Sequence, residues 1–340
     1  MEKVLTIIVP SYNTQDYVER CIPTMLSHPY KDKLELLLVN DGSSDATLER
    51  LQWFERRYPQ TIRVLDKENG GHGSVINVGI QKATGKYLKV VDGDDWVVPK
   101  NLARMICQLE QCNADMVIHP YIRWNIEKKR GTMVRFHGWK NHVMLFEQAA
   151  PRLNGAEIQA ITYRTKILRE NGIRVREKCF YEDTEYDIYP VRYVKTVCIY
   201  NDPVCVYCTG IQTQSVNPDQ TLKNRRMHRL VVKDCMEYYK QNAEQLSFQK
   251  RQYVSRVILK RIRSHYMIYL KSRITARQLQ EIRCWDQELK RESVYFYHLS
   301  QKFPISILRL DIRRTYPYVK RMYQFYEKLQ CCFIGRRWEQ

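Results

Sequence analysis

Three carboxylates within four residues are the strongest chemical signal of the sequence, in the segment Asp92-Gly93-Asp94-Asp95. They follow the apolar run at residues 87–91, which predicts a strand, so they should emerge at the end of that strand. Carboxylates this close repel one another unless a cation lies between them, and Mn²⁺ and Mg²⁺ prefer such oxygen ligands. A divalent metal held here could neutralise a departing diphosphate. The alternative is a solvated turn with a helix cap.

A second acidic segment, Tyr181-Glu182-Asp183-Thr184-Glu185, offers a general base. Deprotonation of an acceptor hydroxyl needs a carboxylate or an imidazole that faces the reacting centre, and Glu182 or Asp183 has that chemistry. Acidic residues are also favoured in the first turn of a helix. Taken alone, the pattern therefore favours a plain helix N-terminus.

Two further loops have the chemistry to bind a nucleotide. Asp41 follows the apolar run at residues 34–39, where a carboxylate can accept hydrogen bonds from a ribose or a base, although Asp41-Gly42 is equally a turn. The glycine-rich segment 69–74 opens a predicted helix, so its free backbone N–H groups could bind phosphate. His72, within this segment, is interpreted as an ordinary loop histidine.

The elements that must position these residues alternate along the first part of the chain. Apolar runs predict four strands, at residues 5–9, 34–39, 62–65 and 87–91. Amphipathic or capped segments predict four helices, at residues 17–27, 46–58, 75–83 and 99–111. This alternation implies a parallel sheet covered by helices, whose ligands bind beyond the carboxyl ends of the strands. The polar segments that follow the strands should therefore meet at one edge.

The later chain divides at a polar stretch, residues 212–220. Before it, residues 116–210 mix short strands with helices and complete the same domain. After it, the apolar periodicity becomes helical. The expected organisation is an α/β domain over residues 1–215, followed by a basic, mainly helical region over residues 216–340.

Five motifs occur in order along the chain: T-I-I-V-P-S-Y-N, V-N-D-G-S-S-D, E-N-G-G-x-G, G-K-Y-L-K-V-V-D-G-D-D and Y-E-D-T-E-Y. Together they resemble glycosyltransferase family 2, over about residues 3–215. The resemblance implies a GT-A fold, which is a Rossmann-like, mostly parallel sheet flanked by helices. It also implies inverting transfer of a sugar from a nucleotide diphosphate donor, expected to be UDP, to an acceptor hydroxyl. The acceptor expected from the family is a glycan or a lipid-linked oligosaccharide, in the synthesis of cell-surface polysaccharide.

The resemblance implies roles for single residues. The uridine end of the donor would be held by Pro10, Tyr12, Asn13 and Asp41. Asp92 would contact the ribose, beside Gly93, and Asp94 would bind the metal, Mn²⁺ or Mg²⁺. Asp183 would be the catalytic base, with Glu182 beside it.

The sequence departs from the family pattern at two places. Many members have Ala-Arg-Asn where this chain has Val75-Ile76-Asn77, so only Asn77 transfers as a donor contact. Members often show a basic residue in the segment that corresponds to residues 207–215, which here contains no Arg or Lys.

Charge divides the chain unequally. Residues 1–220 hold 29 Lys and Arg against 27 Asp and Glu, whereas residues 221–340 hold 27 against 10. Such a basic region binds polyanions, either nucleic acid or an anionic membrane. Cations and aromatic side chains interleave near the C-terminus, which predicts contact with an anionic membrane surface through residues 303–340. The alternative is a helical bundle whose aromatic side chains pack on the enzyme.

Composition also bounds the location of the protein. No apolar run approaches the roughly 20 residues that span a bilayer, and the N-terminal apolar stretch is too short for a signal peptide. The 11 cysteines lack the spacing of a disulfide framework. The expected location is the cytoplasm, peripheral on the inner face of the cell membrane.

Two other classes of function compete with a glycosyltransferase. A nucleic-acid-binding protein would act through the basic region, but RNA-recognition and helix-turn-helix signatures are lacking, so no nucleic-acid partner is expected. A sugar-phosphate nucleotidyltransferase should carry a glycine-rich basic loop after its first strand. This chain has Pro10-Ser11-Tyr12-Asn13 there.

Overall fold

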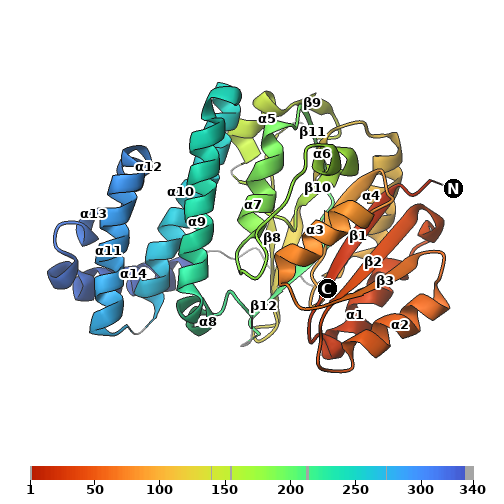
Figure 1. Ribbon diagram of the computed structural model, residues 1–340, viewed down its shortest axis with the longest axis horizontal. Coiled ribbons are helices and arrows are strands. Elements are labelled where there is room, and N and C mark those ends of the chain that lie inside the picture. Colours follow the sequence, from red (N-terminus) through yellow and green to blue (C-terminus); the bar gives the residue numbers. More distant parts are fainter. Residues whose placement is uncertain (1, 139, 154, 212–213, 273, 334–340) are drawn as a thin grey trace.

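An eight-stranded sheet forms the centre of the α/β part of the protein (Figure 1). The computed structural model describes residues 2–138, 140–153, 155–211, 214–272 and 274–333. Across the sheet the strands lie in the order β3 (Ile62–Lys67), β2 (Leu34–Asp41), β1 (Leu5–Ser11), β4 (Tyr87–Val90), β10 (Ile161–Arg164), β6 (Met116–Ile118), β11 (Thr196–Ile199) and β9 (Val143–Leu145).

The first four strands are parallel, as the alternation of strands and helices predicts. β10 runs antiparallel to both β4 and β6, and β9 is antiparallel at the far edge. Every residue of β1 and β2 is buried, because helices cover the sheet and the strands meet water only at their ends. The expected α/β fold with a mostly parallel sheet is confirmed.

The first four helices of this part follow the predicted order, and three more come after them. They are α1 (Gln15–Leu26), α2 (Thr47–Arg57), α3 (His72–Lys82), α4 (Pro99–Gln111), α5 (Phe146–Leu153), α6 (Thr165–Glu170) and α7 (Asp183–Ile188). Helix α3 packs on β1 and β2, and the packing is very close: a Cβ on Gly79 would lie 2.2 Å from Cδ1 of Ile8. This glycine therefore allows the helix to rest directly on the sheet.

The predicted start of the third helix, at residue 75, is wrong by three residues. The helix begins at His72, because Gly71 turns the chain with a φ of +80° and its carbonyl accepts a hydrogen bond from the N–H of Ser74. The second half of the glycine-rich segment is therefore the first helical turn. His72 lies at the N-terminal end of α3.

A smaller four-stranded sheet lies beside the main one. Its order is β5 (Trp96–Val97), β12 (Cys205–Thr209), β7 (Tyr121–Asn125) and β8 (Arg130–Val134). β12 is parallel to β7, and β5 joins it directly after the acidic segment at residues 92–95. The second sheet therefore holds one flank of that acidic segment.

The basic region folds into helices, as expected. They are α8 (Pro218–Lys223), α9 (Arg225–Asn242), α10 (Phe248–Lys271), α11 (Ala276–Glu292), α12 (Val294–Leu299), α13 (Ile305–Leu308) and α14 (Ile312–Phe333). α10 packs on α5 of the α/β part, where the rings of Phe146 and Tyr253 lie 5.3 Å apart. One hydrophobic core joins both parts, and a division between residues 215 and 216 stays a prediction.

The last described helix has two apolar faces. Ile312, Tyr316 and Val319 are buried against the bundle, and the hydroxyl of Tyr316 donates to the carbonyl of Tyr269 at 2.8 Å. Tyr318 on the same helix is exposed, and so is Leu310, which lies just before the helix begins. Among the described helices, none is both long and apolar enough to cross a bilayer. Residues 334–340, which complete the expected membrane contact, lie outside the described residues.

Candidate active site

Asp41 ends β2 and fixes the glycine-rich segment. Its Oδ1 accepts hydrogen bonds from Nζ of Lys67 at 2.6 Å and from the N–H of Gly70 at 2.9 Å, and its Oδ2 accepts from the N–H of Gly71 at 2.8 Å. The carboxylate is almost wholly buried. Two backbone N–H groups that were candidates for phosphate binding are therefore used inside the protein, and they place the N-terminus of α3.

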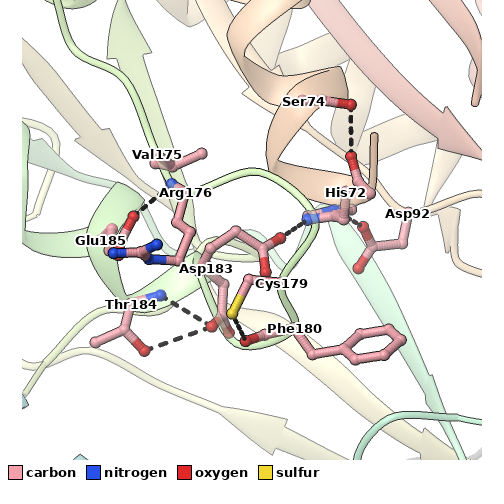
Figure 2. A network of polar contacts seen from close by, with 12 residues as sticks. His72, Ser74, Asp92, Val175, Arg176, Cys179, Phe180, Asp183, Thr184 and Glu185 are labelled. Carbon is pink, nitrogen blue, oxygen red and sulfur yellow. Dashed lines mark hydrogen bonds and ion pairs between the residues drawn. The ribbon is translucent and has the colours of Figure 1, made fainter. Parts of the chain in front are cut away.

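His72 bridges the two acidic segments (Figure 2). Its Nε2 lies 2.9 Å from Oδ1 of Asp92, and its Nδ1 lies 2.6 Å from Oε1 of Glu182. Burial alone would lower the pKa of His72, but the charges and hydrogen bonds of Asp92 and Glu182 outweigh burial and raise that pKa well above its ordinary value. A protonated imidazole at this position would donate one hydrogen bond to each of the two carboxylates.

The interpretation of His72 as an ordinary loop histidine is accordingly wrong. The sequence gives no sign of the contact, because Glu182 lies 110 positions further along the chain. The histidine joins the acidic segment after β4 to the one that opens α7. Distant carboxylates thus come together at one edge of the sheet, as the parallel topology predicts.

The segment that precedes Glu182 is clamped against α3. The side-chain amide of Asn77 donates to the carbonyl of Val175 and accepts from its N–H, both at 2.9 Å. On the same helix, a Cβ on Gly73 would lie only 2.0 Å from the carbonyl oxygen of Arg176. Asn77 therefore positions the segment through hydrogen bonds within the protein, while its contact with the donor stays a prediction.

Asp94 lies in a half-buried and electrostatically unfavourable position. Burial, together with the negative charge of Asp92, raises the pKa of Asp94, although a hydrogen bond from Nε2 of Gln214 at 2.8 Å lowers it in part. Burial and the charges of Asp94 and Asp92 likewise raise the pKa of Asp95 well above its ordinary value. The local excess of negative charge is what a cation would relieve.

Asp183 begins α7 and faces the C-terminal helices. Its Oδ2 lies 3.0 Å from a terminal nitrogen of Arg261 on α10, and its Oδ1 accepts from the N–H of Thr184 at 2.9 Å. Its neighbour Glu182 points the other way, toward His72. The two acids of the pair therefore have different partners, a histidine of α3 and an arginine of the basic region.

The remaining predicted residues lie around the ends of β1 and β4. The carbonyl of Pro10 accepts from the N–H of Gly93 at 3.1 Å, which ties the end of β1 to the acidic segment. Tyr12 is exposed. Asn13 has a φ of +50° and its Oδ1 accepts from the N–H of Ser44 at 2.9 Å, so it links the loops that follow β1 and β2.

The structure thus gathers the predicted residues at one edge but adds others that sequence reasoning missed. Three of these matter most: His72, Gln214 and Arg261. Gln214 lies in the segment where a basic residue was sought and not found, and it contacts the predicted metal ligand instead. Arg261 lies beyond the predicted domain boundary, so no motif pointed to it.

Solved structures of other proteins share this architecture. Over 94% of this chain and 91% of that one, the fold is similar to the crystal structure of TarS 1-349 from S. aureus in complex with UDP-GlcNAc, with a TM-score of 0.68 and 16% identity. It is also similar to the mannosyltransferase PcManGT from Pyrobaculum calidifontis in complex with GDP-Man and Mn²⁺, with a TM-score of 0.51 and 12% identity, over 96% of this chain and 88% of that one. The fold is that of the GT-A glycosyltransferases.

The family follows from the sequence comparison. Residues 6–171 match the family model described as glycosyl transferase family 2, and the chain therefore contains a glycosyltransferase domain of that family. The uncharacterized glycosyltransferase EpsJ of Bacillus subtilis (strain 168) is 28% identical over 215 residues, which are 61% of each chain. The match thus spans less than two thirds of that relative. The resemblance to family 2 and to a GT-A enzyme is confirmed.

Proposed function

We propose that the protein is an inverting glycosyltransferase that moves a sugar from a nucleoside diphosphate donor to an acceptor hydroxyl. The nucleotide proposed is UDP. One observation carries the proposal: His72 joins Asp92, in the acidic segment after β4, to Glu182, in the acidic pair that opens α7. This contact puts the residues expected to hold the donor beside the residues expected to act on the acceptor.

Donor binding is assigned to the loops at the ends of β1, β2 and β4. Tyr12 is exposed and can stack on the base, while the loops that follow β1 and β2 form the surrounding frame. Asp92 and Gly93 would meet the ribose. The similar fold of TarS, determined in complex with UDP-GlcNAc, supports UDP as the nucleotide. The donor contacts proposed are those of Pro10, Tyr12, Asn13, Asp41, Asn77, Asp92 and Gly93.

The residues after β4 also suit a divalent metal. Asp94 is half-buried beside Asp92, and burial together with the negative charge of Asp92 raises its pKa. The described residues contain no cluster of three or more His, Cys, Asp or Glu side chains arranged around a cation. Mg²⁺ and Mn²⁺ often bind with one or two carboxylates, substrate phosphates and water, so Asp94 with the donor diphosphate fits this pattern. Such a metal would stabilise the negative charge of the leaving diphosphate.

Asp183 is proposed as the base. It would accept the proton of the acceptor hydroxyl while that oxygen attacks the anomeric carbon and the diphosphate leaves from the opposite face, which inverts the configuration. Arg261 orients this carboxylate from α10, and Glu182 is held at His72. The two acids therefore have different roles: Asp183 would act on the acceptor, and Glu182 holds the loop on the donor side through His72.

Turnover with a UDP-sugar tests the proposal. A screen of UDP-, GDP- and TDP-sugars with Mn²⁺ should show UDP stabilising the protein and UDP released from one donor. Asp183→Asn should lower transfer by roughly 10²–10⁴-fold with donor affinity retained. Full turnover in Asp183→Asn would remove the base assignment. Release of pyrophosphate from a nucleoside triphosphate would instead favour a nucleotidyltransferase.

The acceptor is proposed to be a glycan or lipid-linked oligosaccharide of the cell surface, reached at the cytoplasmic face of the membrane. On α14, the exposed residues Tyr318, Met322 and Phe325 recur at positions i, i+4 and i+7, so they share one stripe. Arg314 and Arg321 border this stripe. An apolar stripe edged by cations suits a helix that lies on an anionic lipid surface.

Sedimentation with phosphatidylglycerol vesicles at low salt tests the membrane contact. The full chain should sediment, and replacement of Tyr318, Met322 and Phe325 by Ser should release it. A control that replaces the exposed residues Val143 and Leu145 of β9 by Ser should still sediment. If the two variants sediment with the vesicles to the same extent, the proposed membrane contact of α14 is wrong.

A further inference from the structure

Three cationic side chains contact two carboxylates, that of the proposed base Asp183 and that of Glu157. Arg123 comes from β7, and Lys260 and Arg261 come from α10. Lys260 and Arg123 both contact the carboxylate of Glu157, and Arg261 contacts Asp183. Two elements from different parts of the chain therefore bring positive charge to the same side of the site.

The cations border the catalytic residues. Tyr207 of β12 lies directly opposite Arg123 of β7 in the parallel register. Burial raises the pKa of Tyr207, the charges of Asp95, Asp92 and Asp183 raise it further, and the charge of Arg123 opposes them. Tyr207 is therefore within electrostatic reach of the donor-side acids and of the proposed base, and Arg123 lies next to it.

The cations of the cluster outnumber the carboxylates that they contact. In the described part of the chain, Arg123 and Lys260 share Glu157, while Arg261 contacts Asp183. A third acid, Asp187, is wholly buried, and its Oδ1 has no hydrogen-bond partner in the described part of the chain. Burial raises the pKa of Asp187 well above its ordinary value, and no ion pair joins this acid to the three cations within the described residues.

Two of the three cationic groups, those of Lys260 and Arg123, remain accessible. The side chain of Lys260 is 57% exposed and that of Arg123 is 49% exposed, which is far more than their partner Glu157. Within the described residues, Arg123 uses a single terminal nitrogen for its contacts with Tyr121 and Glu157. The rest of its planar guanidinium is free to form paired hydrogen bonds with an anion.

We propose that Arg123, Lys260 and Arg261 form an acceptor subsite that binds an anionic group, a phosphate or a carboxylate, beside the hydroxyl that attacks. The inference rests on the proposed function, because it names the chemical class of the acceptor at the same site. Arg forks and a Lys point charge are the side chains that recognise such anions. A neutral acceptor would leave the exposed ends of Arg123 and Lys260 without an anionic ligand.

Ligand-observed NMR on the full chain, saturated with UDP and Mn²⁺, tests the inference. Saturation fills the donor site first, so that the probes report on the remaining surface. The probes are glycerol 3-phosphate and glucuronate, each compared with its neutral counterpart, glycerol or glucose. The anion should bind at least about tenfold more tightly than its neutral counterpart. A preference for one anion alone identifies phosphate or carboxylate as the group.

Variants place the binding at this cluster. Lys260→Ala and Arg123→Ala should each weaken anion binding by about tenfold, and Lys260→Arg should retain it. Lys166→Ala is the matched control, because Lys166 is equally an exposed lysine paired with a glutamate, Glu170, on α6. That control should bind as the parent does.

The failures are distinguishable. Loss of UDP binding in the parent protein would defeat the proposed function. Retained UDP binding without a preference for either anion would overturn the acceptor subsite alone. An anion preference that survives in both Lys260→Ala and Arg123→Ala would also overturn it.

Discussion

Gly73→Ala changes the closest contact of the site without altering any charge. A Cβ at this position would lie 2.0 Å from the carbonyl oxygen of Arg176 and 2.9 Å from Cγ of Glu182. An ordinary contact between carbon and a carbonyl oxygen is about 3.3 Å, so the segment before α7 must retreat by roughly 1.3 Å. The retreat would carry Glu182 and Asp183 away from the donor side.

Two opposed effects on stability decide the sign of the change. Ala is favoured over Gly within a helix by about 1 kcal/mol, and residue 73 lies in α3. Overpacking against a backbone carbonyl costs about 1–3 kcal/mol. This cost exceeds the stabilisation from the better helix propensity of Ala, except at the lower end of the range. The free energy of unfolding should therefore fall by up to about 2 kcal/mol. A displacement of about 1 Å at the reacting groups should lower the transfer rate by about 100-fold.

Urea denaturation and steady-state release of UDP measure both quantities. UDP affinity should change little, because the hydrogen bonds of Asp41 are untouched. Gly172→Ala is the control: its φ of +60° strains an Ala by about 1–2 kcal/mol, yet a Cβ there meets nothing within 4 Å. That variant should lose stability and keep its rate. A Gly73→Ala protein that is more stable than the parent and fully active would refute the packing described for α3.

Three further changes test other parts of the site. Arg261→Met should slow transfer by about tenfold with UDP affinity unchanged, and Arg261→Lys should recover part of the rate, because Asp183 loses and then regains a cation; an unchanged rate in Arg261→Met would contradict the positioning role. Burial raises the pKa of Glu185 to about 7, so its contribution to stability is complete below its ordinary pKa of 4.5 and is lost as pH rises through about 7. The difference in unfolding free energy between the parent and Glu185→Gln should therefore change by about 3 kcal/mol between these pH values, and a difference independent of pH would contradict this. Asp94→Asn should remove the additional thermal stabilisation that Mn²⁺ gives to the complex with UDP, and an undiminished effect of Mn²⁺ would exclude Asp94 as a ligand.

The fold was predictable over the first four strands, where strands and helices alternate along the chain. The strands β1 to β4 follow from apolar runs, and their parallel arrangement follows from the alternation with helices. The antiparallel strand β10 did not follow, because a short apolar run such as residues 161–164 carries no sign of its direction. Pairing partners are set by packing across the sheet, and no local pattern encodes them.

The same limit applies to the site. Motif order indicated which acids matter, but it could not show that Glu182 and Asp183 turn in opposite directions. Neighbouring residues at a helix start point to different sides, so one reaches α3 and the other α10. The contact with Arg261 depends on how α10 packs against the α/β part, which the helical periodicity of α10 does not specify.

Because α10 contacts both Asp183 and α5, it limits how far the chain can be shortened without loss of the site. A chain cut at residue 215 would retain every recognised motif, yet it would lack Arg261 and uncover Phe146, which now packs on Tyr253. Such a fragment would expose apolar surface, and it should therefore aggregate and be inactive. Hybrids between related enzymes should accordingly be joined after Lys271, where α10 ends, rather than at the boundary that the sequence suggests.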